Sequence, residues 1–266
     1  MRPLAVNAEM SFPKLDFYDR VRVISELGFR VGLWGIDHLD VGKLARTNAV
    51  FSMCDGFGSG NLVEADASHA LVASVEALIP RVIELGRPIM NIHGAKLGSD
   101  GPALHAVHAV GPDGVRNARD TLRRLADLGE KHSINFTVEN LNPMDHPGVP
   151  LNRALDLLPI IQDVGSERVL LNLDLYHAQK DGGNLAALLA ACFGSVGEIQ
   201  VADVPLRNVP GAGGEINYHY LAGEMERLGY TCSVGLEAWA PGDSHGDLGR
   251  YKTIFQHFHG TVGAGK

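Results

Sequence analysis

Four residues with oxygen-bearing side chains lie at the ends of successive apolar runs in the second half of the chain: Glu139, Asp174, Gln200 and Glu237. Each is separated from the next by about one strand-plus-helix unit. If these runs are neighbouring parallel strands, the four side chains converge at one point. Three carboxylates in a partly dry cleft repel one another unless a bound divalent cation or protonation of one of them compensates their charge. Because oxygen-only ligands favour Mg²⁺ or Mn²⁺ over zinc, we expect one of these two ions.

Further residues that could bind a ligand follow the same apolar runs. His177 comes three residues after Asp174, and we expect it on a loop at the same opening, in a functional role. Lys96 lies just past the fourth apolar run. Asp203 follows the seventh run and would either orient a ligand or pair with Arg207.

Alternating apolar segments would position these residues. Strands are predicted at residues 4–8, 30–34, 49–54, 88–93, 133–139, 168–174, 196–202 and 233–237. Helices are predicted at residues 16–27, 41–46, 68–85, 113–130, 151–164, 185–189, 217–228 and 247–258, with Asn184 and Asn217 as N-caps. This strict alternation of apolar strands and helices predicts one α/β domain, a closed parallel (β/α)8 TIM barrel, over residues 1–259. A doubly wound sheet is the main alternative, and residues 260–266 are expected to form a flexible tail.

Length, charge and cysteine usage narrow the class of protein. The 266 residues suit one large α/β barrel, and the net charge of −8 without a basic patch argues against a nucleic-acid partner and for a small molecule. The three cysteines are far apart and lack CxxC spacing, so neither a disulfide framework nor a zinc-thiolate site is indicated. No apolar run suits a signal peptide or a membrane span. We therefore expect a cytoplasmic protein with no membrane partner.

Several motifs resemble those of a known family. They are Val138-Glu139-Asn140-Leu141-Asn142 with Asp145-His146-Pro147-Gly148, Leu173-Asp174-Leu175-Tyr176-His177-Ala178-Gln179, and Ile199-Gln200-Val201-Ala202-Asp203. The most specific is Pro210-Gly211-Ala212-Gly213-Gly214-Glu215-Ile216-Asn217-Tyr218, which is similar to a Pro-Gly-x-Gly-Glu-Ile-Asn-Tyr signature. Through these motifs the chain resembles the hydroxypyruvate isomerases. They belong to the xylose isomerase-like barrels, together with tagatose and psicose 3-epimerases.

The resemblance implies a role for each candidate residue. The ligands of the divalent cation would be Glu139, Asp174, Gln200 and Glu237. Of these, Glu139 and Glu237 would also form the proton-transfer pair. The substrate would be held by His177 and Arg207, and we add Lys96 and Asp145 to the expected substrate contacts.

Three features depart from the family pattern. Gly32 stands where the second strand often carries Glu, and Cys54-Asp55 replaces the His-Asn pair expected after the third strand. The loop at residues 210–215 has one extra glycine. These departures lie on the substrate side of the site rather than among the metal ligands. They therefore affect which substrate is expected and leave the expected type of reaction unchanged.

The leading interpretation is an isomerase that moves a carbonyl between adjacent carbons of a short hydroxy-oxo acid, of hydroxypyruvate or 2-oxo-tetronate type, through a cis-enediolate. The guanidinium fork of Arg207, helped by Lys96, would suit the carboxylate of such a substrate. A ketose 3-epimerase with the same cation and glutamate pair is the alternative. An endonuclease IV-like phosphodiesterase would need more metal-binding histidines and a basic face. A non-catalytic metal-binding scaffold also remains, and the oligomeric state, a homo-oligomer included, stays open.

Overall fold

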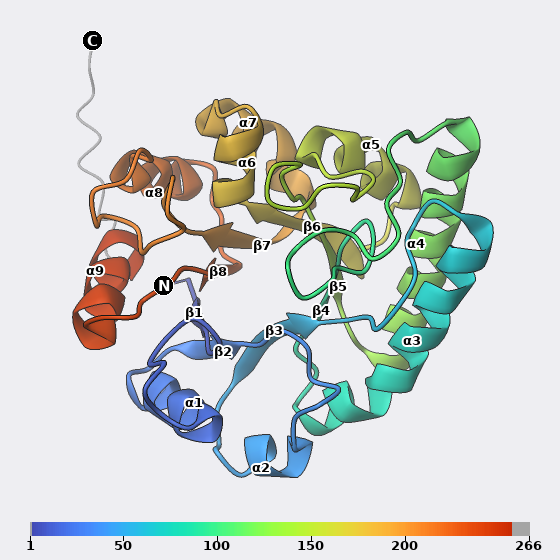
Figure 1. Ribbon diagram of the computed structural model, residues 1–266. Coiled ribbons are helices and arrows are strands. Elements are labelled where there is room, and N and C mark those ends of the chain that lie inside the picture. The colour runs from blue at the N-terminus through green and yellow to red at the C-terminus, as the bar shows by residue number, and fades with distance from the viewer. Residues whose placement is uncertain (1, 257–266) are drawn as a thin grey trace.

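Eight parallel strands close into a barrel in the computed structural model, which describes residues 2–256. The strands follow chain order around the barrel, and β8 pairs back with β1 (Figure 1). Their bounds are β1 Leu4–Asn7, β2 Arg30–Gly32, β3 Phe51–Asp55, β4 Ile89–Ile92, β5 Phe136–Glu139, β6 Val169–Asp174, β7 Val196–Val201 and β8 Ser233–Leu236. The predicted TIM barrel is confirmed. A doubly wound sheet is excluded, because it would leave two strand edges unpaired.

Helices surround the barrel and separate successive strands (Figure 1). They are α1 Phe17–Glu26, α2 Val41–Ala45, α3 Ala65–Glu84, α4 Pro112–His132, α5 Ala154–Val164, α6 Leu175–Asp181, α7 Leu185–Cys192, α8 Tyr218–Arg227 and α9 Ser244–Gln256, with a short 3₁₀ turn at Phe193–Ser195. The predicted tail at residues 260–266 lies outside the described residues. Over the part of the chain that is described, no helix combines the length and the apolar character that crossing a membrane requires.

Side-chain caps fix where several helices begin. Asp16 accepts a hydrogen bond from the Tyr18 amide at the start of α1. Asn217 accepts one from the amide of Tyr220, which confirms it as the cap of α8. Asn184 does occupy the N-cap position of α7, but its side chain makes no capping hydrogen bond.

Helix α6 was not predicted from the sequence. It begins directly after β6, and the Asp174 carboxylate caps it by accepting a hydrogen bond of 2.9 Å from the backbone amide of His177. The expectation that His177 lies on a loop is therefore wrong. His177 sits in the first turn of α6 and is fully buried.

The two faces of the strands differ in chemistry. Side chains such as Val138, Leu171 and Ile199 are buried and belong to the continuous hydrophobic core. Alternate positions carry polar side chains that hydrogen-bond one another inside the barrel, as Asn91 and Asn172 do at 3.2 Å. The interior of the barrel is therefore polar near the carboxyl ends of the strands, where the barrel opens.

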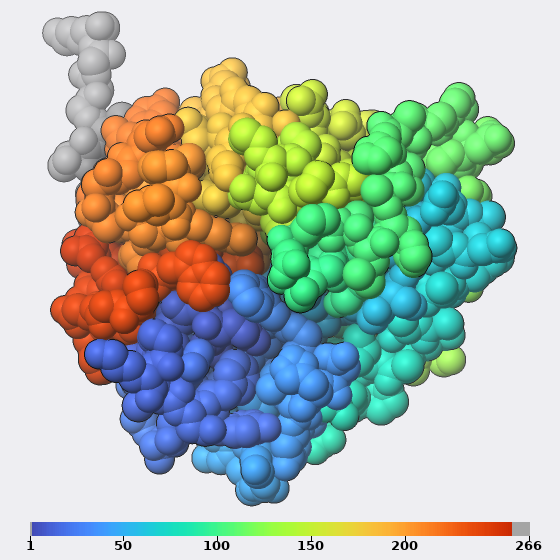
Figure 2. Space-filling model, in the orientation of Figure 1, coloured from blue at the N-terminus to red at the C-terminus, as the bar shows by residue number. Residues whose placement is uncertain are grey.

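Loops cover part of this opening. The segments between β4 and α4 and between β5 and α5 lie over the barrel on the face shown (Figure 1 and Figure 2). They pack closely at Gly94, where an added Cβ would lie 1.8 Å from the carbonyl oxygen of Pro150. Only glycine fits at this point, because the neighbour is backbone and cannot rotate away.

Candidate active site

A cavity of about 310 Å³ lies at the carboxyl ends of the strands. Its wall includes most of the predicted site residues and several others: Asp55, Asn91, His93, Lys96, Glu139, His177, Gln200, Arg207 and Glu237. Asp174 meets two of these residues, because its Oδ2 atom lies 3.8 Å from both His177 Nε2 and Arg207 Nη2. The convergence predicted from the strand ends is therefore observed. Register supports it, since Glu139 pairs with Asn172, and Asp174 with Gln200.

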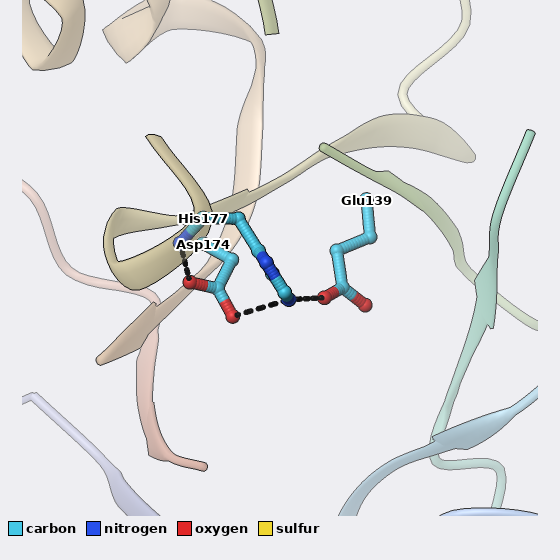
Figure 3. Close-up of side chains that lie close together, drawn as sticks. All are labelled: Glu139, Asp174 and His177. Carbon is cyan, nitrogen blue, oxygen red and sulfur yellow. Dashed lines mark hydrogen bonds and ion pairs between the residues drawn. The ribbon is translucent and has the colours of Figure 1, made fainter. Parts of the chain in front are cut away.

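Glu139, Asp174 and His177 form a compact buried group of side chains that could hold a metal ion (Figure 3). One candidate ligand atom from each of the three lies within 4.8 Å of the others, and all three residues are buried. His177 Nε2 lies 3.9 Å from Glu139 Oε1 and 3.8 Å from Asp174 Oδ2. Among the residues that the structure describes, no hydrogen-bond partner satisfies this nitrogen. An unsatisfied buried group at this position suits a bound ligand.

The tautomer of His177 decides what this nitrogen can offer. Asn142 Nδ2 lies 2.7 Å from His177 Nδ1, and Asn142 Oδ1 accepts from the amides of Met144 and Asp145. These bonds orient the Asn142 amide so that it donates to Nδ1. Burial, followed by the charge of Arg207, lowers the pKa of His177 well below its usual range, so the ring is neutral and its proton is on Nε2. Nε2 is then a hydrogen-bond donor rather than a metal ligand.

Oxygen atoms therefore remain as the candidate ligands for a cation. Carboxylate oxygens come from Glu139, Asp174 and Glu237, and an amide oxygen comes from Gln200. Such a donor set would suit Mg²⁺ or Mn²⁺. The cluster needs positive charge, because burial raises the pKa of Asp174 to about 8 and that of Glu237 to about 7.

Glu139 behaves in the opposite way. Burial alone would raise its pKa, but the hydrogen bond and charge of His93, then the charge of Arg207, outweigh burial and lower the pKa. His93 Nε2 lies 3.3 Å from Glu139 Oε2, and Asn91 Nδ2 donates to the same oxygen at 2.5 Å. The two glutamates proposed for proton transfer thus have different surroundings.

Arg207 contacts two of the carboxylates. Its Nη2 lies 3.1 Å from Glu237 Oε1 and 3.8 Å from Asp174 Oδ2, and its Nε donates to the backbone oxygen of Glu237 at 3.2 Å. The guanidinium also stacks over the Tyr176 ring, 5.1 Å from its centroid. The backbone of Arg207 is left-handed, with φ 54°, and its carbonyl accepts from the Trp239 amide. Side chain and backbone together tie Arg207 to the end of β8.

An amide network lies beneath the carboxylates. Asn172 Nδ2 donates to Gln200 Oε1 at 2.8 Å and to Asn91 Oδ1 at 3.2 Å. Asn91 Oδ1 also accepts from Thr137 Oγ1 at 2.9 Å. Because Asn91 in turn holds Glu139, this network links two of the predicted ligands, on β5 and β7.

Two predicted residues lie differently from the others. Asp145 is not among the residues that line the cavity, and its carboxylate accepts from Lys180, Tyr176 and Asn142. Asp203 does not pair with Arg207. Its Oδ1 accepts instead from the amides of Val204 and Ile216, and an added Cβ on Gly214 would collide with its carboxylate. Asp203 therefore anchors the glycine-rich segment at residues 209–217.

Several residues that line the cavity were not predicted from the sequence as site residues. His93 and Asp55 stand at the ends of β4 and β3, where the rule used for the other four strands would have found them. Trp34 lies two residues past β2 and donates from Nε1 to Glu237 Oε1 at 2.8 Å. Its role had no sequence signal, because an indole after a strand is most often part of the core.

Comparisons with known proteins find similar chains that cover most of this one. A 2-oxo-tetronate isomerase of Haemophilus influenzae is 28% identical over 89% of this chain and 93% of its own length. The hydroxypyruvate isomerase of Escherichia coli is 26% identical over 89% of this chain and 93% of its own length. Among solved structures, a family 2 AP endonuclease from Brucella melitensis superposes with a TM-score of 0.84 at 24% identity, covering 95% of this chain and 99% of that one. A D-psicose 3-epimerase superposes with a TM-score of 0.74 at 16% identity, covering 97% of this chain and 100% of that one.

These two structural similarities establish the fold alone, because both sequence identities are below 25%. The model of the xylose isomerase-like TIM barrel family matches residues 40–255, which contain all four predicted cation ligands and the glycine-rich signature. The closed barrel and the polar cavity at its carboxyl end are consistent with this match. The protein belongs to the xylose isomerase-like TIM barrel family.

Proposed function

We propose that this protein is a divalent-cation-dependent isomerase that moves a carbonyl between adjacent carbons of a short hydroxy-oxo acid, of hydroxypyruvate or 2-oxo-tetronate type. The observation that carries the proposal is the position of Glu139 and Glu237. These two carboxylates line one cavity from strands separated by two others, and both belong to the donor set that suits Mg²⁺ or Mn²⁺. The names of the relatives, 2-oxo-tetronate isomerase and hydroxypyruvate isomerase, support the same class of reaction.

The reaction requires a proton to leave the hydroxyl-bearing carbon next to the carbonyl. A proton must then be added to the carbon that carried the carbonyl. A carboxylate on each side of the substrate plane can do both steps, one as base and one as acid. Glu139 and Glu237 are assigned these roles. His177, whose Nε2 proton has no partner, donates a hydrogen bond to a substrate oxygen.

A cation held by oxygens of Glu139, Asp174, Gln200 and Glu237 would supply a Lewis acid for the carbonyl and hydroxyl oxygens of the substrate. The chain provides the remaining requirements. Asn91 and Asn172 orient Glu139 and Gln200 through hydrogen bonds, and Trp34 fixes Glu237. The loops after β4 and β5 restrict the access of water to the reacting carbons.

Hydrogen exchange in deuterated water tests the proposal. The purified protein is incubated with hydroxypyruvate, 2-oxo-tetronate, fructose or tagatose, with Mg²⁺ or Mn²⁺ or with a chelator. We expect metal-dependent deuterium incorporation and a new carbonyl position in the acids, with kcat/KM for the acids at least about tenfold higher than for the sugars. Inversion of a neutral ketose without carbonyl migration would instead establish a 3-epimerase. Absence of exchange in every substrate would leave a metal-binding scaffold.

A further inference from the structure

Two long cationic side chains line the cavity of the described chain, Arg207 and Lys96. Their surroundings differ. Arg207 already faces Glu237 and Asp174, bonds a backbone carbonyl, and stacks on Tyr176. Its charge is therefore matched by carboxylates of the protein itself, and a substrate carboxylate would have to compete with Glu237 and Asp174 for the guanidinium.

Lys96 has no such partner. Across residues 2–256, no carboxylate oxygen lies within 4.0 Å of its Nζ atom, whose one hydrogen bond goes to the carbonyl oxygen of Phe57 at 3.2 Å. Asp55 lines the same cavity, but burial raises the pKa of Asp55 even against the charges of His93 and Lys96. Asp55 is therefore a distant counter-ion, because its carboxylate oxygens lie more than 4.0 Å from Lys96 Nζ. Lys180 offers a contrast, because it lies against Asp145 at 2.5 Å.

The backbone of Lys96 is held on both sides. Its amide donates to Gly60 at 2.9 Å, and its carbonyl accepts from Leu104 at 2.9 Å. The ammonium group lies over the Phe57 ring, 5.4 Å from its centroid, and Phe57 packs edge-on against His93 at 5.8 Å. A cation held this firmly beside apolar surface, with two donors free, is ready to accept an anion.

From these contacts we propose that Lys96, rather than Arg207, binds the carboxylate of the substrate. The inference rests on the proposed isomerase function and adds an orientation to it. The acid end of the substrate lies on the β3–β4 side of the cavity, next to Phe57 and His93. The carbons that exchange the carbonyl then lie toward Glu139 and Glu237. Arg207 has a positioning role, which is to hold Glu237 in place.

Binding and turnover of matched acids and neutral compounds test this assignment. Glycerate and glycerol, neither of which can isomerise, serve as binding probes in calorimetry. Hydroxypyruvate and dihydroxyacetone serve as a reactive pair that differs in the carboxylate. The variants are Lys96→Met, which keeps the aliphatic stem, Lys96→Arg, which keeps the charge, and Arg207→Lys. Lys14→Met removes the same charge at an exposed position and is the control.

We expect Lys96→Met to weaken glycerate binding and to lower kcat/KM for hydroxypyruvate by about tenfold to a hundredfold, the scale of one charged hydrogen bond. Glycerol binding and any dihydroxyacetone turnover should be unchanged, Lys96→Arg should restore most of the acid binding, and Lys14→Met should have no effect. Arg207→Lys should lower turnover through Glu237 while glycerate binding remains.

Two results would overturn the assignment. One is glycerate binding that is the same in Lys96→Met and in wild type, and the other is loss of glycerate binding in Arg207→Lys alone. Failure of the proposed function looks different. In that case the wild-type protein converts no acid, while calorimetry still reports whether Lys96 is the anion-binding residue.

Discussion

Asn172 offers a test of how the barrel interior supports the site. Its side chain touches none of the proposed reacting groups, yet it donates to Gln200 Oε1 at 2.8 Å and to Asn91 Oδ1 at 3.2 Å. In Asn172→Ala, Asn91 Oδ1 keeps its bond from Thr137, but Gln200 Oε1 loses the donor that orients it. A buried acceptor left without a donor costs about 1 to 3 kcal/mol of stability. The larger effect should be on the affinity for the cation.

Loss of a residue that orients a metal ligand typically reduces metal affinity or activity by about tenfold to a hundredfold. We therefore expect Asn172→Ala to weaken Mn²⁺ binding by that factor in calorimetry and to lower turnover at limiting metal. Asn117→Ala is the matched control. It removes one partly buried amide bond, from Asn117 Nδ2 on helix α4 to the Val63 carbonyl at 2.9 Å, and neither residue lines the cavity. Urea unfolding should show a loss of stability in both variants.

The reasoning is refuted if Asn172→Ala binds Mn²⁺ within about twofold of wild type while the urea transition confirms the lost bond. Gln200 would then be held by the barrel backbone alone. Equal weakening of metal binding in Asn117→Ala would also refute it, because a general loss of stability would be the cause.

The remaining predictions concern the carboxyl groups. Glu139→Gln and Glu237→Gln should each lower turnover by at least about a hundredfold while retaining some metal, and near-normal isotope exchange in either variant would exclude that residue as a proton carrier. Asp174→Ala should lose its bound cation in metal analysis, and unchanged metal content would contradict the ligand set. Burial raises the pKa of Glu9 from 4.5 to about 8, so the folded state keeps a proton that the unfolded chain releases, and this contribution to stability falls as pH rises from about 5 to 8. Glu9→Gln should remove a slope of at most about 1.4 kcal/mol per pH unit from the urea-derived stability, whereas the exposed control Glu167→Gln should leave the slope as in wild type.

Much of the fold could be predicted from the sequence because apolar periodicity and helix-ending residues determine the elements directly. Each of the eight strands was placed within a few residues of its observed bounds. Helix α6 was missed because seven residues are too few to show a helical repeat, and because its N-cap, Asp174, had already been interpreted as a site residue. The same short helix explains why His177 is buried rather than exposed on a loop.

The candidate site was predicted less completely, and the reason is geometric. The rule that parallel strands end at one opening brings Glu139, Gln200 and Glu237 to a common cavity. The same rule does not predict which residue a loop side chain will contact. The direction of Arg207 depends on its left-handed backbone and on its contacts with Glu237 and Trp239, none of which leaves a trace in residue spacing. Asp203 was likewise close to Arg207 in sequence but bonds backbone amides instead.

The position of Arg207 has a consequence for how the protein acquires its cation. The guanidinium is an internal counter-ion, since it already lies against Glu237 and Asp174. Folding therefore does not have to wait for a metal ion to screen the buried carboxylates. The incoming ion meets carboxylates whose charge Arg207 already compensates in part, so the measured affinity for the cation is lower than bare carboxylates would give. A chelated sample should remain folded, and it should regain its cation without refolding.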